Sequence, residues 1–311
     1  MTGKKSLAPG SHEYRQFESR NINSLCSLSG YSRQAFYKFR KNAEKEALQH
    51  DLILQQVISI RKTLKRVGTR KLLFMMQSFM QQHHIQIGRD AIFDLLASHR
   101  LLIRRRIRRI PVTTFSNHWM HKFPNLIIGF IPTAPNQLWV SDITYICLQN
   151  AFAYLSLITD AYSRKIVGFC LLETLSADGC IKALKMALSG NPQLGRLIHH
   201  SDRGSQYCCA DYVGILEKKY IKISMTQSGD PLENSLAERV NGILKDELLE
   251  KQYLNFKEAR QAIAAAISIY NHIRPHSSID MLTPVEAHLR EGELKRRWKN
   301  YYSKRKEVTM T

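Results

Sequence analysis

The chain has 311 residues, about twice the usual length of a domain, so we expect at least two domains. Its 46 Lys and Arg outnumber 26 Asp and Glu, and the net charge of +20 argues against an ordinary metabolic enzyme and favours a polyanionic partner. The six cysteines have no paired or metal-type spacing, and no apolar run approaches the ~18 residues of a membrane span. We therefore expect a cytoplasmic protein without disulfides or a membrane partner.

The excess of basic residues lies at the two ends of the chain. Residues 1–134 carry 23 basic and 7 acidic side chains, whereas residues 135–289 carry 15 basic and 16 acidic ones. A strongly basic stretch and a nearly neutral one are expected to present different binding surfaces, so residues 1–134 are the better candidate for contact with a polyanion. The composition and the elements below predict five segments: a helix-turn-helix-like segment at 1–50, a helical DNA-binding domain at 51–112, a linker at 113–134, an α/β core at 135–289 and a basic tail at 290–311.

The first predicted elements are two helices around a turn at Gly30, within residues 21–41. This layout suits a helix-turn-helix, whose second helix can enter a DNA major groove. Plain packing of a helical hairpin is an equal alternative. On the first interpretation, Arg33 and Lys38 of the second helix are candidate DNA contacts.

A second helical unit runs from about Leu52 to Ile110, with a break at residues 67–69 and a short third helix from Arg89 to Arg100. It ends in five arginines within six positions, which cannot all face a core. A solvated linker is one interpretation. The basic balance of this region favours the other, an arm that follows DNA phosphates. The arm consists of Arg104, Arg105, Arg106, Arg108 and Arg109.

From residue 136 the hydrophobic period changes from that of helices to that of strands. Three runs rich in β-branched and aromatic residues, separated by short turns, predict consecutive antiparallel strands at 137–146, 151–159 and 165–172. The predicted order then continues with a helix at 177–188, a strand at 196–200, a helix at 207–219, a strand at 221–225 and long helices at 235–252 and 256–273. Together these elements predict a mixed α/β sheet of the ribonuclease-H type.

Three acidic residues of this region are candidate metal ligands. Asp142 lies within the first strand among apolar residues, where a carboxylate is costly to bury unless it binds a cation. Asp202 follows a strand, and Glu238 lies in a helix after 35 intervening residues. Taken singly, each has a structural explanation as an edge-strand acid, a helix cap or a solvated residue. Asp160, at another strand end, is expected to bind local backbone in a turn instead.

The order and spacing of these acids carry a resemblance. Asp142-Ile143-Thr144, the stretch from His200 to Tyr207, and a Glu after 35 residues resemble the D, D-35-E signature of the retroviral-integrase superfamily. They resemble more closely the second-reading-frame transposases of bacterial insertion sequences. The resemblance is strong over 135–289 and weak over 20–110. A retroviral-type zinc module is missing, because His118 and His121 have no matching Cys pair, so we expect these two histidines to pack or to be solvated.

The resemblance implies an integrase-type catalytic core preceded by helical DNA-binding domains. In such an enzyme Asp142, Asp202 and Glu238 would coordinate two Mg²⁺ ions, with Mn²⁺ as a substitute, for DNA 3′-end cleavage and strand transfer. Lys245, seven residues after Glu238, and Arg203, beside Asp202, are candidate phosphate contacts.

The implied partners are double-stranded DNA, namely the terminal inverted repeats and the target, and further copies of the chain, at least as a dimer. The upstream-frame protein is a candidate partner or fusion. We expect such a protein in the bacterial cytoplasm, associated with the nucleoid. Three alternatives stay open: a virus-type integrase, a plain ribonuclease-H-like nuclease, and a catalytically silent DNA-binding regulator derived from a transposase.

Overall fold

The computed structural model describes residues 22–103, 118–191, 195–227, 234–295 and 297. Contacts divide the chain into two compact units. One holds residues up to Lys62 together with Met75–Leu102, and the other, called the core unit below, holds Thr63–Phe74 and the residues from Ile103 on. The five arginines of the predicted arm lie outside the described residues, as does most of the predicted basic tail.

The first unit is helical, as predicted. Helix α2 (Ile22–Ser29) ends at Gly30, whose φ of +70° suits a residue without Cβ, and α3 (Arg33–Thr63) follows. Helices α5 (Gln77–Gln82) and α6 (Arg89–Ser98) complete the unit. The two helices expected around Gly30 are therefore confirmed. However, α3 has 31 residues and runs across the segment boundary predicted at residue 50.

The core unit is built on a five-stranded mixed sheet. Strands β1 (Leu138–Cys147), β2 (Phe152–Asp160) and β3 (Ile166–Leu172) are antiparallel, whereas β4 (Ile198–Ser201) and β5 (Lys222–Met225) run parallel to β1. The strand order is β3-β2-β1-β4-β5, with β1 at the centre. This order confirms the predicted mixed sheet of the ribonuclease-H type.

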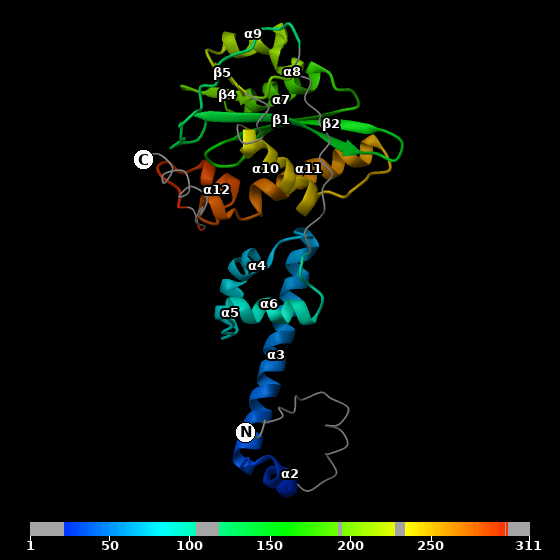
Figure 1. Ribbon diagram of the computed structural model, residues 1–311, viewed down its shortest axis with the longest axis vertical. Helices are drawn as coiled ribbons and strands as arrows, with labels where there is room; N and C mark the ends of the chain where they lie inside the picture. Colours follow the sequence, from blue (N-terminus) through cyan, green and yellow to red (C-terminus); the bar gives the residue numbers. More distant parts are fainter. Residues whose placement is uncertain (1–21, 104–117, 192–194, 228–233, 296, 298–311) are drawn as a thin grey trace, which may run out of the picture. The chain divides into compact units, whose positions relative to one another are not determined.

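Helices cover both faces of this sheet (Figure 1). On one face, buried Trp139 packs with residues of α7 (Ala177–Gly190), α8 (Ser205–Cys208) and α9 (Ala210–Lys218). On the other, buried Leu155 packs with residues of α10 (Ser235–Ile243), the π-helical turn η2 (Leu244–Leu248) and α11 (Phe256–His272). The unit also contains α4 (Thr69–Met75), the 3₁₀ turn η3 (Ser277–Ile279) and α12 (Pro284–His288). No helix among the described residues has the length and apolar character to cross a bilayer.

Two predicted helices differ from the structure in their continuity. The helix expected over 207–219 is interrupted at Cys209, whose ψ of 146° is extended, so it becomes α8 and α9. The helix expected over 235–252 changes at Leu244 to the π-helical turn and ends at Leu248. A π turn adds a residue to one helical turn, which shifts the angular position of the residues that follow.

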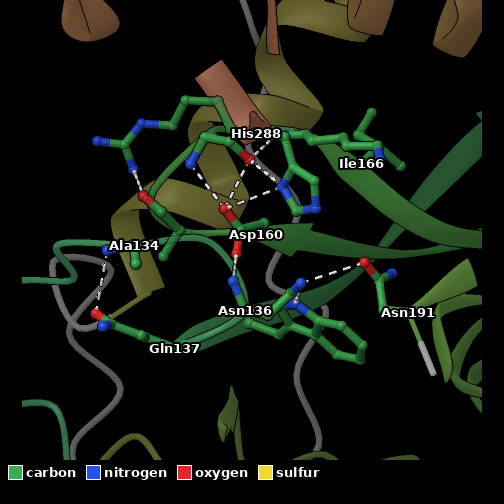
Figure 2. Close-up of polar contacts among 12 residues, drawn as sticks. Ala134, Asn136, Gln137, Asp160, Ile166, Asn191 and His288 are labelled. Carbon is green, nitrogen blue, oxygen red and sulfur yellow. Dashed lines mark hydrogen bonds and ion pairs between the residues drawn. The ribbon is translucent and has the colours of Figure 1, made fainter. Parts of the chain in front are cut away.

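Asp160 is fully buried and serves as a hydrogen-bond acceptor that joins distant parts of the core unit (Figure 2). Its Oδ1 accepts from the backbone N–H of Ser163 at 2.7 Å and from the Ser163 hydroxyl at 2.6 Å, as expected for a turn acid. Its Oδ2 accepts from the backbone N–H of Asn136 at 2.7 Å, before β1 begins. Nδ1 of His288, in α12, lies 3.8 Å from Oδ1. The local role expected from sequence is confirmed, and the structure adds contacts to the segment before β1 and to α12.

We expect Asp160→Asn to destabilise the core unit. The Asn side chain has an NH₂ group in place of one carboxylate oxygen, and this group would face N–H or O–H groups that now donate to Asp160. The free energy of unfolding should therefore fall by about 2–4 kcal/mol. Chemical denaturation at pH 7 measures this. Asp178→Asn, at an exposed position in α7, is the matched control and should cost less than about 1 kcal/mol. Equal losses in the two variants would contradict the role of Asp160.

Candidate active site

The pairing of two parallel strands brings Asp142 and Asp202 together. Leu138, Trp139 and Val140 of β1 lie opposite Ile198, His199 and His200 of β4, a constant offset in residue number. Continuing this register by two residues places Asp142 beside Asp202, just beyond the paired part of β4. The position of the two aspartates is therefore set by backbone hydrogen bonds between neighbouring strands.

The turn after β4 orients the Asp202 side chain. Asp202 Oδ1 accepts a hydrogen bond of 3.0 Å from the backbone N–H of Gly204, which directly precedes α8. A Cβ atom on Gly204 would lie 3.1 Å from the same carboxylate oxygen, closer than most real Cβ contacts. The glycine thus lets the carboxylate fold back over the start of the helix.

Two asparagines tie α10 to β1, one on each side of Glu238. Asn234 Nδ2, at the start of α10, donates to the backbone carbonyl of Ser141 at 3.0 Å. Asn241 Nδ2 donates to Asp142 Oδ2 at 2.7 Å. Residues 234, 238 and 241 are spaced four and three apart, so they share one face of the helix. Glu238 therefore lies on the face of α10 that is held against the strand of Asp142, and its side chain is exposed.

The electrostatics of Asp142 indicate how close the three carboxylates are. Burial, the charge of Asp202 and, more weakly, the charge of Glu238 raise the pKa of Asp142 to about 7. The hydrogen bonds from Asn241 and from the backbone N–H of Ile143 act in the opposite direction. The arrangement concentrates negative charge at one place, and hard carboxylate oxygens of this kind suit Mg²⁺ or Mn²⁺.

The predicted ligands Asp142, Asp202 and Glu238 lie in one region of the core unit, but their side chains do not form a complete metal-coordination site. Among the described residues, no three His, Cys, Asp or Glu side chains converge in the manner of a formed metal site. The two histidines expected to pack or to be solvated do so: His118 Nε2 lies 2.8 Å from the backbone carbonyl of Arg203, and exposed His121 stacks edge-on against Phe123.

The predicted DNA contacts lie in different surroundings. Arg203 is half-buried beside Asp202, whereas Arg33 and Lys38 are exposed on α3. Lys245 is half-buried in η2, beyond the point where α10 loses regular α-helical geometry. The seven-residue spacing that predicts the same face for Lys245 and Glu238 assumes an unbroken α-helix, and the π turn changes that phase. Contact of these residues with DNA stays a prediction.

Sequence reasoning missed the two asparagines. Both are buried, and the side-chain oxygens of Asn234 and Asn241 have no hydrogen-bond partner among the described residues. Asn241 could have been found from its position three residues after Glu238, on the same helical face. Asn234 carries no comparable signal, because an Asn before a helix is ordinarily interpreted as a cap, and here its side chain makes no cap hydrogen bond.

Comparison with known proteins matches the core region to integrase domains. Two family models, both described as integrase core domain, match residues 132–231 and 219–284. The chain is 37% identical over 265 residues to the insertion element IS600 uncharacterized 31 kDa protein of Shigella sonnei, covering 84% of this chain and 96% of that protein. It is 31% identical to the transposase for insertion sequence element IS629 of Shigella sonnei, over 65% of this chain and 68% of the relative.

A solved structure with a similar chain path is the HTLV-2 integrase catalytic core domain in complex with magnesium. The likeness covers 51% of this chain and 99% of that one, at 20% identity and a TM-score of 0.41.

We expect Asp142→Asn to stabilise the chain above neutral pH when no divalent metal is present. A carboxyl whose pKa is raised by folding supports the folded state at low pH, and this contribution is lost as the pH rises from about 4 to about 7. The variant should therefore gain about 1–3 kcal/mol over the wild type between pH 5 and pH 8, measured by denaturation in chelator. Exposed Asp211→Asn is the control, with no such gain. Parallel pH profiles of wild type and Asp142→Asn would contradict the effect of burial and neighbouring charge on Asp142.

Proposed function

The chain belongs to the insertion-sequence transposases with an integrase core domain, enzymes of the polynucleotidyl transferase type, and from this premise we propose the steps that it performs. It binds the terminal inverted repeats of its element, cleaves the DNA 3′ ends and joins them to target DNA. Both steps use one site formed by Asp142, Asp202 and Glu238.

The observation that carries this proposal is the electrostatic interaction of Asp142 on β1 with Asp202, in the turn after β4, and with Glu238 on α10. Burial, together with the negative charges of Asp202 and Glu238, raises the pKa of Asp142, and a divalent cation would relieve both effects. The donor set consists of hard anionic oxygens, so the residues present fit Mg²⁺, with Mn²⁺ as a substitute and two ions per site. Bound there, the ions would activate the attacking oxygen and stabilise the leaving one.

The surrounding residues fix the positions of these carboxylates. Asn241 binds one oxygen of Asp142 and leaves the carboxylate ionised more readily, because a hydrogen bond to the charged form favours that form. Gly204 holds an oxygen of Asp202. Asn234 anchors the first turn of α10, and with it Glu238, to the backbone of Ser141. In this scheme the asparagines and Gly204 are positioning residues, and the three acids are catalytic.

The remaining parts of the proposal concern DNA and assembly. The basic helical region before the core would hold the terminal repeats, with Arg33 and Lys38 and the five-arginine arm as phosphate contacts that position the duplex. Lys245 and Arg203 would contact phosphates near the carboxylates. Joining two element ends to one target requires paired subunits, so the working form is at least a dimer, with the upstream-frame protein as a fusion or a partner.

We expect Glu238→Gln to abolish joining while DNA binding persists. The assay joins an oligonucleotide carrying the element's terminal repeat to plasmid DNA in Mg²⁺ or Mn²⁺. Losing several kcal/mol of charge stabilisation in the transition state lowers the rate by at least about a hundredfold. Glu217→Gln, at an exposed position in α9, is the matched control and should join at the wild-type rate.

The other outcomes of this assay separate the alternatives. Cutting without joining would indicate a nuclease. Binding without either reaction, in wild type as in variant, would indicate a DNA-binding regulator and would refute the catalytic proposal for this chain.

A further inference from the structure

A group of cations surrounds one carboxylate beside α10. Glu247, in the π-helical turn that extends α10, forms two short hydrogen bonds with Arg274, 2.7 Å from Nη2 to Oε1 and 2.8 Å from Nε to Oε2. Lys71 of α4 also faces this carboxylate, with its Nζ 3.4 and 3.5 Å from the two oxygens. Lys71 belongs to Thr63–Phe74, the segment that is part of the core unit. All of these contacts therefore lie within one compact unit.

Arg274 alone satisfies the charge of Glu247. Its guanidinium binds both carboxylate oxygens in the bidentate geometry that Arg favours, and its side chain is only 3% exposed. Arg274 Nη1 also lies 2.9 Å from Nε2 of buried His276. Burial lowers the pKa of His276 well below its usual value, so this histidine is neutral and contributes no charge. Lys71, at longer distances from Glu247, is thus a second cation for a carboxylate that already has one.

A third cation, Arg239, lies within electrostatic range of Lys71. Arg239 is exposed on α10, next to Glu238 in the chain. Burial, followed by the charge of Arg274 and then that of Arg239, lowers the pKa of Lys71 to about 8 against the opposing effect of Glu247. The three cations Arg274, Lys71 and Arg239 outnumber the one carboxylate, Glu247. This group of four side chains therefore carries a net positive charge. Such a charge is costly in a half-buried place unless an anion comes to it.

We propose that Lys71 and Arg239 form a phosphate-binding site for the DNA backbone, built on the Glu247–Arg274 pair and placed beside Glu238. Glu247 of this pair holds the Lys71 ammonium in position through the contacts described above. Arg239 is exposed to solvent on α10, the helix that carries Glu238. The inference rests on the proposed function, because it takes the anion to be a phosphate of the DNA end being cut. The inference gives α4 a direct contact with DNA at the site. Most of this helix lies in the Thr63–Phe74 segment, which connects the two stretches of chain that form the first unit.

The test is the salt dependence of DNA binding, measured in chelator so that no catalysis occurs. One lost phosphate contact makes the slope of log K against log salt less steep by about 0.9, which is about an eightfold loss of affinity at 0.1 M salt. We expect this change for Lys71→Met and for Arg239→Met, with terminal-repeat and scrambled duplexes affected equally, because a phosphate contact carries no sequence information. Lys71→Arg keeps the charge and should keep the slope. Lys185→Met, at an exposed position in α7 on the opposite face of the sheet, is the matched control.

A second measurement detects the contact directly in the wild-type chain. Lysine labelling with acetic anhydride, quantified by mass spectrometry, should show Lys71 protected by bound duplex and Lys185 equally reactive with and without it.

The outcomes separate this inference from the proposed function. If Lys71→Met lowers the melting temperature but leaves the salt slope unchanged, and duplex does not protect Lys71, then Lys71 only supports Glu247 and the inference is overturned. In that case, joining by the wild type and its loss in Glu238→Gln would leave the proposed function intact. If the wild type binds no duplex, both fail.

Discussion

The core unit must hold three like charges together before any cation joins them, and the rest of the site depends on how it meets that requirement. Two of the charges are placed by the pairing of β1 with β4, which backbone hydrogen bonds keep in register. The third is carried by α10, which two asparagine side chains bind to the backbone and the carboxylate of β1. Burial and the remaining repulsion together raise the pKa of Asp142. Stability given up at such a place is common where a protein is organised for chemistry.

A contrast between two aspartates on adjacent strands shows how surroundings decide a role. Asp160 receives hydrogen bonds from the backbone and the hydroxyl of Ser163 and from the backbone of Asn136, so its charge is fully solvated by the protein. Asp142 receives one amide hydrogen bond from Asn241 and one from the adjacent backbone, and it faces two further acids. Both lie in strands among apolar residues. The number of donors supplied, more than burial, distinguishes the structural acid from the reactive one.

Most of the core sheet and its order of elements could be predicted from sequence, because period-two apolar runs and short turns are local patterns. The grouping of Asp142, Asp202 and Glu238 was expected from the family resemblance that their order and spacing carry. The partners of Glu247 were beyond such reasoning, because this carboxylate binds Arg274, 27 residues away, and Lys71, 176 residues away. No local pattern encodes pairs at these separations. The π turn that begins at Leu244 also has no signal in the types of residue that form it.

The three acids differ in the kind of interaction that holds each of them in place. The spacing between the two aspartates belongs to a ladder of strand hydrogen bonds, and changing it would break the sheet. Glu238 belongs to a helix that two side-chain amides and the buried residues Val240 and Ile243 hold against the sheet. It follows that backbone pairing positions the two aspartates, whereas side chains position the glutamate. The two asparagines and the glutamate that they orient belong to one continuous stretch of chain, so this segment carries its own attachment to β1.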